Sequence, residues 1–331
     1  MCVATRNRAH LLPRLVSALE RQLVDPSRFE VIIANDASTD RTSEVLEELT
    51  ERSPLRIRVL NSPSRGGPAS GRNLAWQASN ADLIAFTDDD CVPTPDWLGV
   101  HLSALADVDI SQGQVLSDPD QNAAAGPMAR RIAVVDENGL YETCNICYRK
   151  AWLERLGGFD TSFRRAGEDA DLAWRAKLAG ATTAFSPEAM VHHDVDPFSW
   201  RRELRHTWRW EGVVLLADRH PHLRARFAPG RRTWRGYHRP ALLAAGGLTL
   251  VGWGIAGRSA RSFLLGAAAT APYTWYRLHA EPVDGSRRTR LRLFFPMLTI
   301  DTSEAAVITV TQARLRLRSL LRRTSQGTGL D

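Results

Sequence analysis

The sequence contains only four cysteines, and its 331 residues are ample for a buried core, which excludes a small disulfide-stapled scaffold. Cys2, Cys91, Cys144 and Cys147 are irregularly spaced and do not indicate an oxidising compartment. Cys144 and Cys147 form a C-x-x-C pair, but no second cysteine or histidine pair completes a zinc site. We therefore expect small buried thiols rather than a redox or metal centre.

The N-terminus lacks the apolar stretch of a secretory signal peptide. Arg6, Arg8, His10 and Arg14 interrupt any apolar run before a cleavage site could occur. A cytoplasmic location is therefore expected for the N-terminal part of the chain.

Charge is distributed unevenly between two parts of the chain. Residues 1–197 carry 20 basic and 29 acidic side chains, a net −9, whereas residues 198–331 carry 23 and 8, a net +15. An acidic part needs a cation to bind a phosphate compound, and a basic part favours an anionic partner. Basic helices more often face solvent or a membrane than nucleic acid, so we expect a membrane surface and no nucleic acid.

Residues 1–197 alternate short apolar runs with helical patterns, and the runs at 1–4, 29–34, 55–60 and 83–87 have the length of strands. This alternation predicts an α/β fold, a mostly parallel, Rossmann-like sheet flanked by helices. Residues 110–133 lack a clear period and predict an irregular strand with a mobile loop. Ligands of such sheets bind beyond the carboxyl ends of the strands, where Thr5, Asp36 and the acidic run at 88–90 fall.

The basic part divides into a helical extension at 198–240, an apolar helical hairpin at 241–278 and a basic tail at 279–331. The uncharged stretches of the hairpin are shorter than the roughly 20 residues that span a bilayer comfortably. Two spanning helices, an interfacial hairpin and a buried helix pair are the alternatives. Flanking tryptophans such as Trp253 and Trp275 favour membrane contact.

Two acidic groups carry the candidate chemistry. Asp88, Asp89 and Asp90 follow an apolar strand, where adjacent carboxylates repel unless a cation compensates them, and Mg²⁺ or Mn²⁺ suits such ligands. Glu168 and Asp169 follow Gly167 at the start of a predicted helix. Alone they would be read as a helix cap, but beside a metal site Asp169 becomes a candidate general base.

Six segments in a fixed order give the sequence a family resemblance. Residues 2 to about 197 resemble family 2 glycosyltransferases of the GT-A fold, which are nucleotide-sugar-dependent and inverting. The segments lie at 5–9, 31–40, 66–73, 88–90, 157–160 and 167–175.

The resemblance implies a role for each matching residue. Thr5, Asn7, Asp36, Arg72, Asp88 and Asp89 would bind the donor nucleotide; Asp90, Asp88 and His193, in preference to His192, would bind Mg²⁺ or Mn²⁺. Asp169 would be the catalytic base, Glu168 would orient the acceptor, and Trp97 and Asn145 would contact its sugar.

The activity that follows is transfer of a sugar, most simply from a UDP-sugar, to a hydroxyl of a glycan or glycolipid at the inner face of the cell membrane. A sugar transferase acting on a polyprenyl phosphate and a catalytically silent carbohydrate-binding or scaffold protein are the alternatives. Asn35 stands where the family usually has an aspartate. Recognition of the nucleotide base is therefore expected to differ from that of the family. The family also has more residues before Val3, so a truncated sequence or misplaced start codon is expected.

Overall fold

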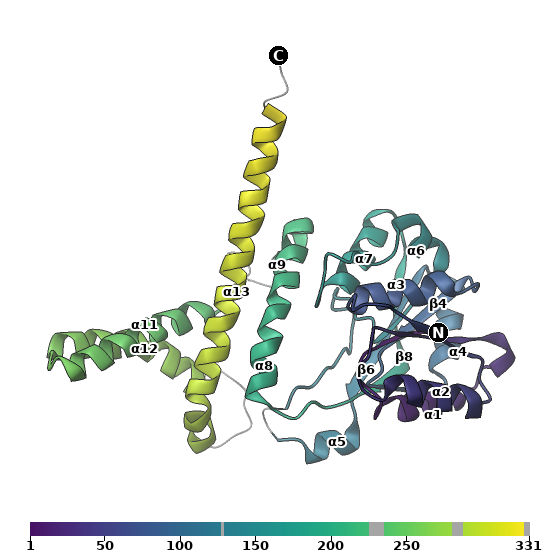
Figure 1. The fold of residues 1–331 in the computed structure, drawn as a ribbon, viewed down its shortest axis with the longest axis horizontal. Helices are drawn as coiled ribbons and strands as arrows, with labels where there is room; N and C mark the ends of the chain where they lie inside the picture. Colours follow the sequence, from purple (N-terminus) through teal and green to yellow (C-terminus); the bar gives the residue numbers. More distant parts are fainter. Residues whose placement is uncertain (127–128, 225–234, 280–286, 328–331) are drawn as a thin grey trace. The chain divides into compact units, whose positions relative to one another are not determined.

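The computed structural model describes residues 1–126, 129–224, 235–279 and 287–327 (Figure 1). The chain forms two compact units, Met1–Pro197 and Phe198–Asp331. The division falls where the balance of charge changes sign, so the acidic and basic parts are separate folding units.

The first unit is built on one mixed eight-stranded sheet in the order β3-β2-β1-β4-β7-β6-β8-β5. The first four strands of that order are mutually parallel, β4 pairs antiparallel with β7, and β6 pairs parallel with β8. The strands are β1 Cys2–Thr5, β2 Val31–Asn35, β3 Ile57–Asn61, β4 Leu83–Thr87, β5 Cys91–Pro93, β6 Ile110–Ser117, β7 Asn145–Arg149 and β8 Thr183–His193.

Helices cover both faces of this sheet, which is why strand β2, between β3 and β1, is buried along its whole length (Figure 1). One face packs against α1 (Leu12–Glu20), α2 (Thr42–Arg52) and α4 (Trp97–Ala104). The other packs against α3 (Pro68–Ala78), α6 (Lys150–Leu156) and α7 (Glu168–Leu178). Short elements η1 (Pro26–Arg28) and α5 (Pro119–Ala124) complete the unit.

The strand register brings the candidate site residues to one edge of the sheet. Thr5 pairs with Asn35 at the carboxyl ends of β1 and β2, and Thr87 at the end of β4 pairs with Asn145 at the start of β7. Parallel strands end at a common edge, so the residues that follow β1, β2 and β4 must lie near one another.

The segment at 110–133 is more regular than its sequence predicts. Its first part is the eight-residue strand β6, which pairs with both β7 and β8, while 127–128 lie outside the described residues. Ser111 and Gln112 interrupt the apolar pattern expected of a buried strand, because both are polar yet buried. Ser111 is hydrogen-bonded to His101, and Gln112 donates to Glu142. Strands β5 and β8 were not predicted from the sequence.

The second unit is helical. Its elements are α8 (Trp200–His206), η2 (Thr207–Arg209), α9 (Trp210–Arg219), η3 (Pro221–Leu223), α11 (His238–Ala256), α12 (Ala260–His279) and α13 (Arg287–Gly327). Helices α11 and α12 form a hairpin, and side-chain bonds from both of them hold it to α13: Arg277 pairs with Asp301, and His238 bonds Glu304. A Cβ on Gly266 would lie 2.5 Å from the Gly247 carbonyl oxygen, so glycine allows the two helices to pack closely.

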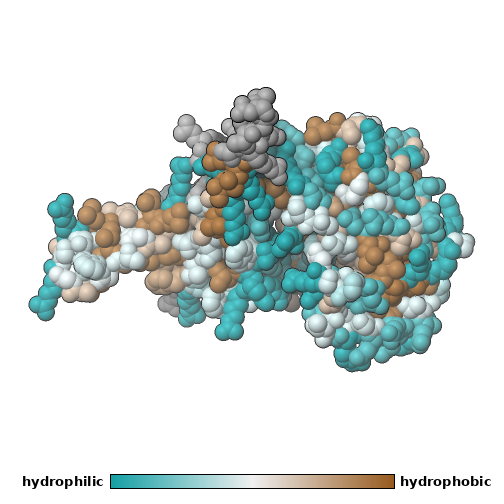
Figure 2. Space-filling model, turned by 45° about the horizontal axis from the view of Figure 1, so that its top comes forward, coloured by the Kyte–Doolittle hydropathy of each residue, from teal (hydrophilic) through white to brown (hydrophobic). Residues whose placement is uncertain are grey.

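The hairpin leaves large apolar side chains in solvent on its outer faces. Trp253 is 74% exposed, Leu264 65% and Trp275 63%, and Figure 2 shows hydrophobic surface along this arm. By length and composition, α11 and the part Arg292–Leu321 of α13 could cross a membrane. The arm therefore exposes more apolar surface than a two-helix hairpin can bury by itself.

Candidate active site

Asp88, Asp89 and Asp90 follow β4 directly, and each carboxylate has a different set of partners. Asp88 accepts a hydrogen bond from Arg72 Nη2 at 2.8 Å. Asp89 accepts one from Thr5 Oγ1 at 2.6 Å, and Asp90 lies 3.3 Å from His193 Nε2. The triplet therefore joins the ends of β1, β4 and β8 to α3.

Asp89 is the most enclosed member of the triplet. Burial and the neighbouring charge of Asp90 raise its pKa to about 7, against the lowering effect of the Thr5 hydroxyl and the Arg8 guanidinium. Arg8 lies 3.9 Å from Asp89 and 3.7 Å from Asp90, and its side chain is 40% exposed. Thr5, expected to line a nucleoside pocket, is buried and donates to this carboxylate.

Asp90 and His193 form a pair that fits a divalent cation. The imidazole Nδ1 lies 2.8 Å from the Asp194 carbonyl oxygen, which can only accept, so Nδ1 carries a proton and Nε2 is the ring atom that faces Asp90. Burial raises the pKa of Asp90, and the neighbouring His193 and Arg8 oppose the rise. A carboxylate oxygen and an imidazole nitrogen are donors that Mn²⁺ and Mg²⁺ accept.

Cys91 also lies within 4.8 Å of both Asp90 and His193. Burial raises its thiol pKa well above the usual value. Mg²⁺ and Mn²⁺ also prefer oxygen ligands to sulfur, so Asp90 and His193 are the better candidates. All four cysteines are free and buried, in agreement with the expectation of buried thiols. His192, the adjacent histidine, pairs with Val92 in the sheet and alternates to the opposite face from His193.

Arg72 connects the acidic triplet to the second acidic group. Its Nη1 donates to Glu168 Oε1 and its Nη2 to Asp88 Oδ1, both at 2.8 Å. Burial alone would lower the pKa of Arg72, but the charges of Asp88 and Glu168 raise it. One buried guanidinium thus fixes the distance between two acids that are 80 residues apart in sequence.

Glu168 and Asp169 form the first turn of α7. Glu168 is 4% exposed, and its second oxygen, Oε2, has no hydrogen-bond partner among the described residues. Asp169 is partly exposed. Among the described residues, its carboxylate accepts a hydrogen bond from the Ala170 amide alone. Burial and the charge of Glu168 raise the pKa of Asp169 well above its usual value, with Arg72 opposing them.

The loops after β1 and β2 are bonded to each other. Asn7 adopts a positive φ of 53°, and its Oδ1 accepts a bond from the Thr39 amide at 2.7 Å. Asp36 is buried and accepts bonds from the Gly66 and Gly67 amides at 2.6 and 2.9 Å. Asp36 therefore fixes the glycine loop that begins α3, and recognition of the nucleotide base by Asp36 and Asn7 stays a prediction.

Trp97 on α4 and Asn145 at the start of β7 lie in the interior of the first unit. Both are fully buried, and the Trp97 Nε1 donates to Asn145 Oδ1 at 2.7 Å. The Asn145 amide donates to the carbonyl oxygens of Gln114 and Ala189, where β6 and β8 change register. Neither side chain has an exposed atom in this structure, and contact of Trp97 and Asn145 with an acceptor sugar stays a prediction.

Arg8 was not among the predicted site residues, although it lies within the first matching segment. Its position could have predicted it, because Arg8 follows the end of β1 by three residues and therefore falls at the same sheet edge as the acids. The glycine pair at 157–158 serves the fold: a Cβ on Gly158 would meet Asn73 and Trp76 within 3 Å, and Asn73 bonds the backbone of Phe159.

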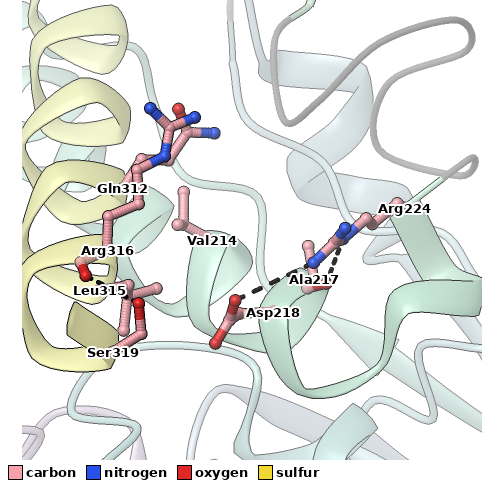
Figure 3. A pocket seen from close by; sticks show the side chains of 8 residues that line it. All are labelled: Val214, Ala217, Asp218, Arg224, Gln312, Leu315, Arg316 and Ser319. Carbon is pink, nitrogen blue, oxygen red and sulfur yellow. Dashed lines mark hydrogen bonds and ion pairs between the residues drawn. The ribbon is translucent and has the colours of Figure 1, made fainter. Parts of the chain in front are cut away.

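The second unit holds a cavity of about 420 Å³ between α9 and α13 (Figure 3). Arg224 pairs with Asp218 on its wall and donates to the Ala217 carbonyl, and Ser319 bonds the Arg316 carbonyl. None of the sequence-predicted site residues lines it. The lining residues are Val214, Ala217, Asp218, Arg224, Gln312, Leu315, Arg316 and Ser319.

Comparison with protein families matches residues 1–171 to the model described as glycosyl transferase family 2. A pre-mycofactocin glycosyltransferase of Mycobacterium tuberculosis is 29% identical over 209 residues, covering 58% of this chain and 42% of the relative. The succinoglycan biosynthesis protein ExoM of Rhizobium meliloti is 28% identical over 207 residues, covering 58% and 65%. The chain thus spans less than two thirds of the length of each of these relatives.

Solved structures share the fold at low identity. Mannosyltransferase PcManGT from Pyrobaculum calidifontis, in complex with GDP-Man and Mn²⁺, has a TM-score of 0.58 at 19% identity and covers 93% of this chain and 85% of its own. S. aureus TarS 1–349, in complex with UDP-GlcNAc, has a TM-score of 0.51 at 15% identity, covering 94% and 90%.

Proposed function

Because the chain belongs to glycosyl transferase family 2, we propose that it transfers a sugar from a nucleoside-diphosphate sugar to a hydroxyl acceptor, with inversion at the anomeric carbon. The observation that carries this proposal is the Arg72 bridge, which holds the triplet after β4 against the acidic turn that opens α7. This bridge supports the proposal because it would hold the proposed donor site and the proposed base at a fixed separation.

Asp169 is the proposed base. Its raised pKa makes it a stronger base than a free aspartate, and its partial exposure lets an acceptor reach it. Asp169 removes the proton of the acceptor hydroxyl as that oxygen forms a bond to the anomeric carbon. The bond from that carbon to the diphosphate oxygen breaks on the opposite side, and its electron pair leaves with the diphosphate. A single displacement of this kind inverts the configuration.

Glu168 and Arg8 are proposed to act on the two ends of this displacement. The unpartnered buried oxygen of Glu168 can accept a hydrogen bond from the acceptor and orient it. Arg8 is exposed enough to approach the departing diphosphate. Asp90, Asp88 and His193 would hold Mn²⁺ or Mg²⁺, which supplies further positive charge for the diphosphate when bound.

The donor is proposed to be a UDP-sugar, with Thr5, Asn7, Asp36 and Asp89 shaping the nucleotide site. The two fold neighbours differ in this respect, since one was solved with GDP-Man and Mn²⁺ and the other with UDP-GlcNAc. Glycan assembly is the proposed setting because a relative takes part in succinoglycan biosynthesis. An acceptor hydroxyl on a glycan or glycolipid fits this setting.

A membrane surface is proposed as the partner of the second unit, placing the enzyme at the cytoplasmic face of the cell membrane. Helices α11 and α12 contain no acidic residue, and Arg258 and Arg261 lie at the turn between them. Exposed tryptophans and leucines beside such arginines suit an anionic lipid interface. The same observation supports a second candidate, in which the acceptor is a polyprenyl phosphate.

Calorimetric titration tests the donor site. The purified chain is titrated with UDP, GDP and dTDP, each with and without Mn²⁺ or Mg²⁺. We expect one nucleotide to bind only with the metal, and Asp90→Ala to abolish that binding.

Asp96→Ala is the matched control, because Asp96 lies in the same unit and is exposed. It should bind the nucleotide as the wild type does. If the folded wild-type chain binds none of the three nucleotides, the enzyme proposal fails and a silent scaffold on this fold is the better description.

A further inference from the structure

Arg14 joins two carboxylates that the proposed mechanism does not use. Its Nη2 donates to Asp118 and its Nη1 to Asp194, and each bond comes from a different nitrogen. Arg14 lies on α1, Asp118 is the N-cap of α5, and Asp194 follows β8 directly. One guanidinium thus connects three elements that are distant in sequence.

Gln121 of α5 closes the arrangement. Its Nε2 donates to the Asp194 carboxylate at 2.8 Å, its Oε1 accepts from the Val195 amide at 2.8 Å, and its own amide donates to Asp118 at 2.9 Å. We call Arg14, Asp118, Gln121 and Asp194 the α5 clamp. Its members bond one another through charged groups, which makes these bonds stronger than neutral ones.

The α5 clamp is bonded directly to the proposed metal ligands. The Asp194 amide donates to the Asp90 carbonyl at 2.9 Å, and the Asp118 amide donates to the His193 carbonyl at 2.8 Å. The Asp194 carbonyl accepts the His193 Nδ1 proton, which leaves Nε2 directed at Asp90. Groups that orient a metal-binding histidine in this way typically change metal affinity by about 10- to 100-fold when removed.

We infer that the α5 clamp positions His193 for the metal and couples the metal-binding end of β8 to α5. The inference rests on the proposed function for the metal, but the coupling to α5 does not depend on it. A purely stabilising ion pair is the simpler reading. A purely stabilising pair would leave Mn²⁺ binding unchanged when Arg14 is replaced, so the two readings predict different measurements.

The test uses the full chain and the variants Arg14→Gln, Asp194→Asn and Arg14→Lys. Binding of Mn²⁺ alone is followed by electron paramagnetic resonance, and hydrogen exchange is followed at the Val195 amide. We expect Arg14→Gln and Asp194→Asn to raise the half-saturating Mn²⁺ concentration about tenfold and to speed exchange at Val195. Arg14→Lys should recover part of both effects, since lysine keeps the charge but not the two-nitrogen fork.

Arg58→Gln is the matched control, because Arg58 pairs with Glu30 in the same unit at similar exposure and should change neither readout. Unchanged Mn²⁺ binding together with unchanged Val195 exchange in Arg14→Gln would overturn the inference. If the wild type binds no Mn²⁺, the metal part of the proposed function fails. Exchange at Val195 then decides the coupling: faster exchange in Arg14→Gln supports it, and unchanged exchange overturns it.

Discussion

The carboxylates of the candidate site are kept close together by a small number of arginine, histidine and hydroxyl groups. Asp89 and Asp90 both have raised pKa values because they are buried with too little positive charge around them. Asp88 and Glu168, by contrast, share the buried Arg72. Within the triplet, the two carboxylates with raised pKa values are therefore the two that Arg72 does not contact.

Replacing Asp169 by asparagine tests the base at the residue scale. Asp169→Asn should lower the transfer rate by about 10²- to 10⁴-fold, because the amide cannot accept the acceptor proton. Nucleotide affinity should stay within a few-fold of wild type, and calorimetry and a transfer assay measure the two effects. Glu47→Gln, an exposed acid on α2, is the control. A wild-type transfer rate in Asp169→Asn would remove Asp169 from the mechanism.

Replacing Arg72 by glutamine tests the bridge. Arg72→Gln leaves Glu168 buried without its counterion, so the free energy of unfolding should fall by roughly 3–5 kcal/mol. Adding Glu168→Gln removes that buried charge, and the double variant should lose less stability than the sum of the single changes. Urea unfolding measures both. Additive losses would mean that the two side chains do not interact.

At the scale of elements, α4 is held to the sheet by a neutral histidine. His101 is fully buried, with Nδ1 2.8 Å from the Ser111 hydroxyl and Nε2 2.8 Å from Asn145 Oδ1. Burial lowers its pKa to about 4. The ring that joins α4, β6 and β7 therefore stays uncharged at neutral pH.

His101 predicts a pH dependence of stability. The unfolded chain takes up this proton below about pH 6.5 and the folded chain only near pH 4, so stability falls as the pH falls through that window. Between pH 7 and pH 4.5, the free energy of unfolding should fall by about 2–3 kcal/mol less in His101→Gln than in wild type. Urea unfolding at both pH values measures it. His10→Gln, at an exposed position, should behave as wild type; an equal loss in His101→Gln would contradict the prediction.

At the scale of the whole molecule, the chain combines an acidic α/β unit with a basic helical unit that has apolar surface in solvent. Pairing of Arg277 with Asp301 and of His238 with Glu304 holds the base of the α11–α12 hairpin to α13. Farther from α13, α11 and α12 bury the glycine- and alanine-rich faces that they turn toward each other, and the described side chains on their outer faces stay exposed. A lipid surface would cover the remaining side chains.

Removing apolar side chains from the hairpin tests membrane binding. Leu250→Ser, Trp253→Ser, Leu264→Ser and Leu265→Ser together should lower co-sedimentation with anionic phospholipid vesicles at least tenfold, because each replaced side chain is exposed and available to lipid. Leu23→Ser with Leu178→Ser, equally exposed in the first unit, is the control. Equal vesicle binding by both variants would exclude the hairpin as the contact.

Local patterns were enough to predict the family, the α/β fold and the positions of the acids, because strand and helix periods are local and strand ends are marked by the residues that follow them. Which distant groups meet is set by the tertiary structure. It places Arg72 between Asp88 and Glu168 and buries Trp97, and neither arrangement follows from a local pattern. Strand β6 was obscured for the same reason, since its polar side chains are buried by bonds to other elements. Periodicity reports exposure along one segment, whereas these pairings are set by sheet order.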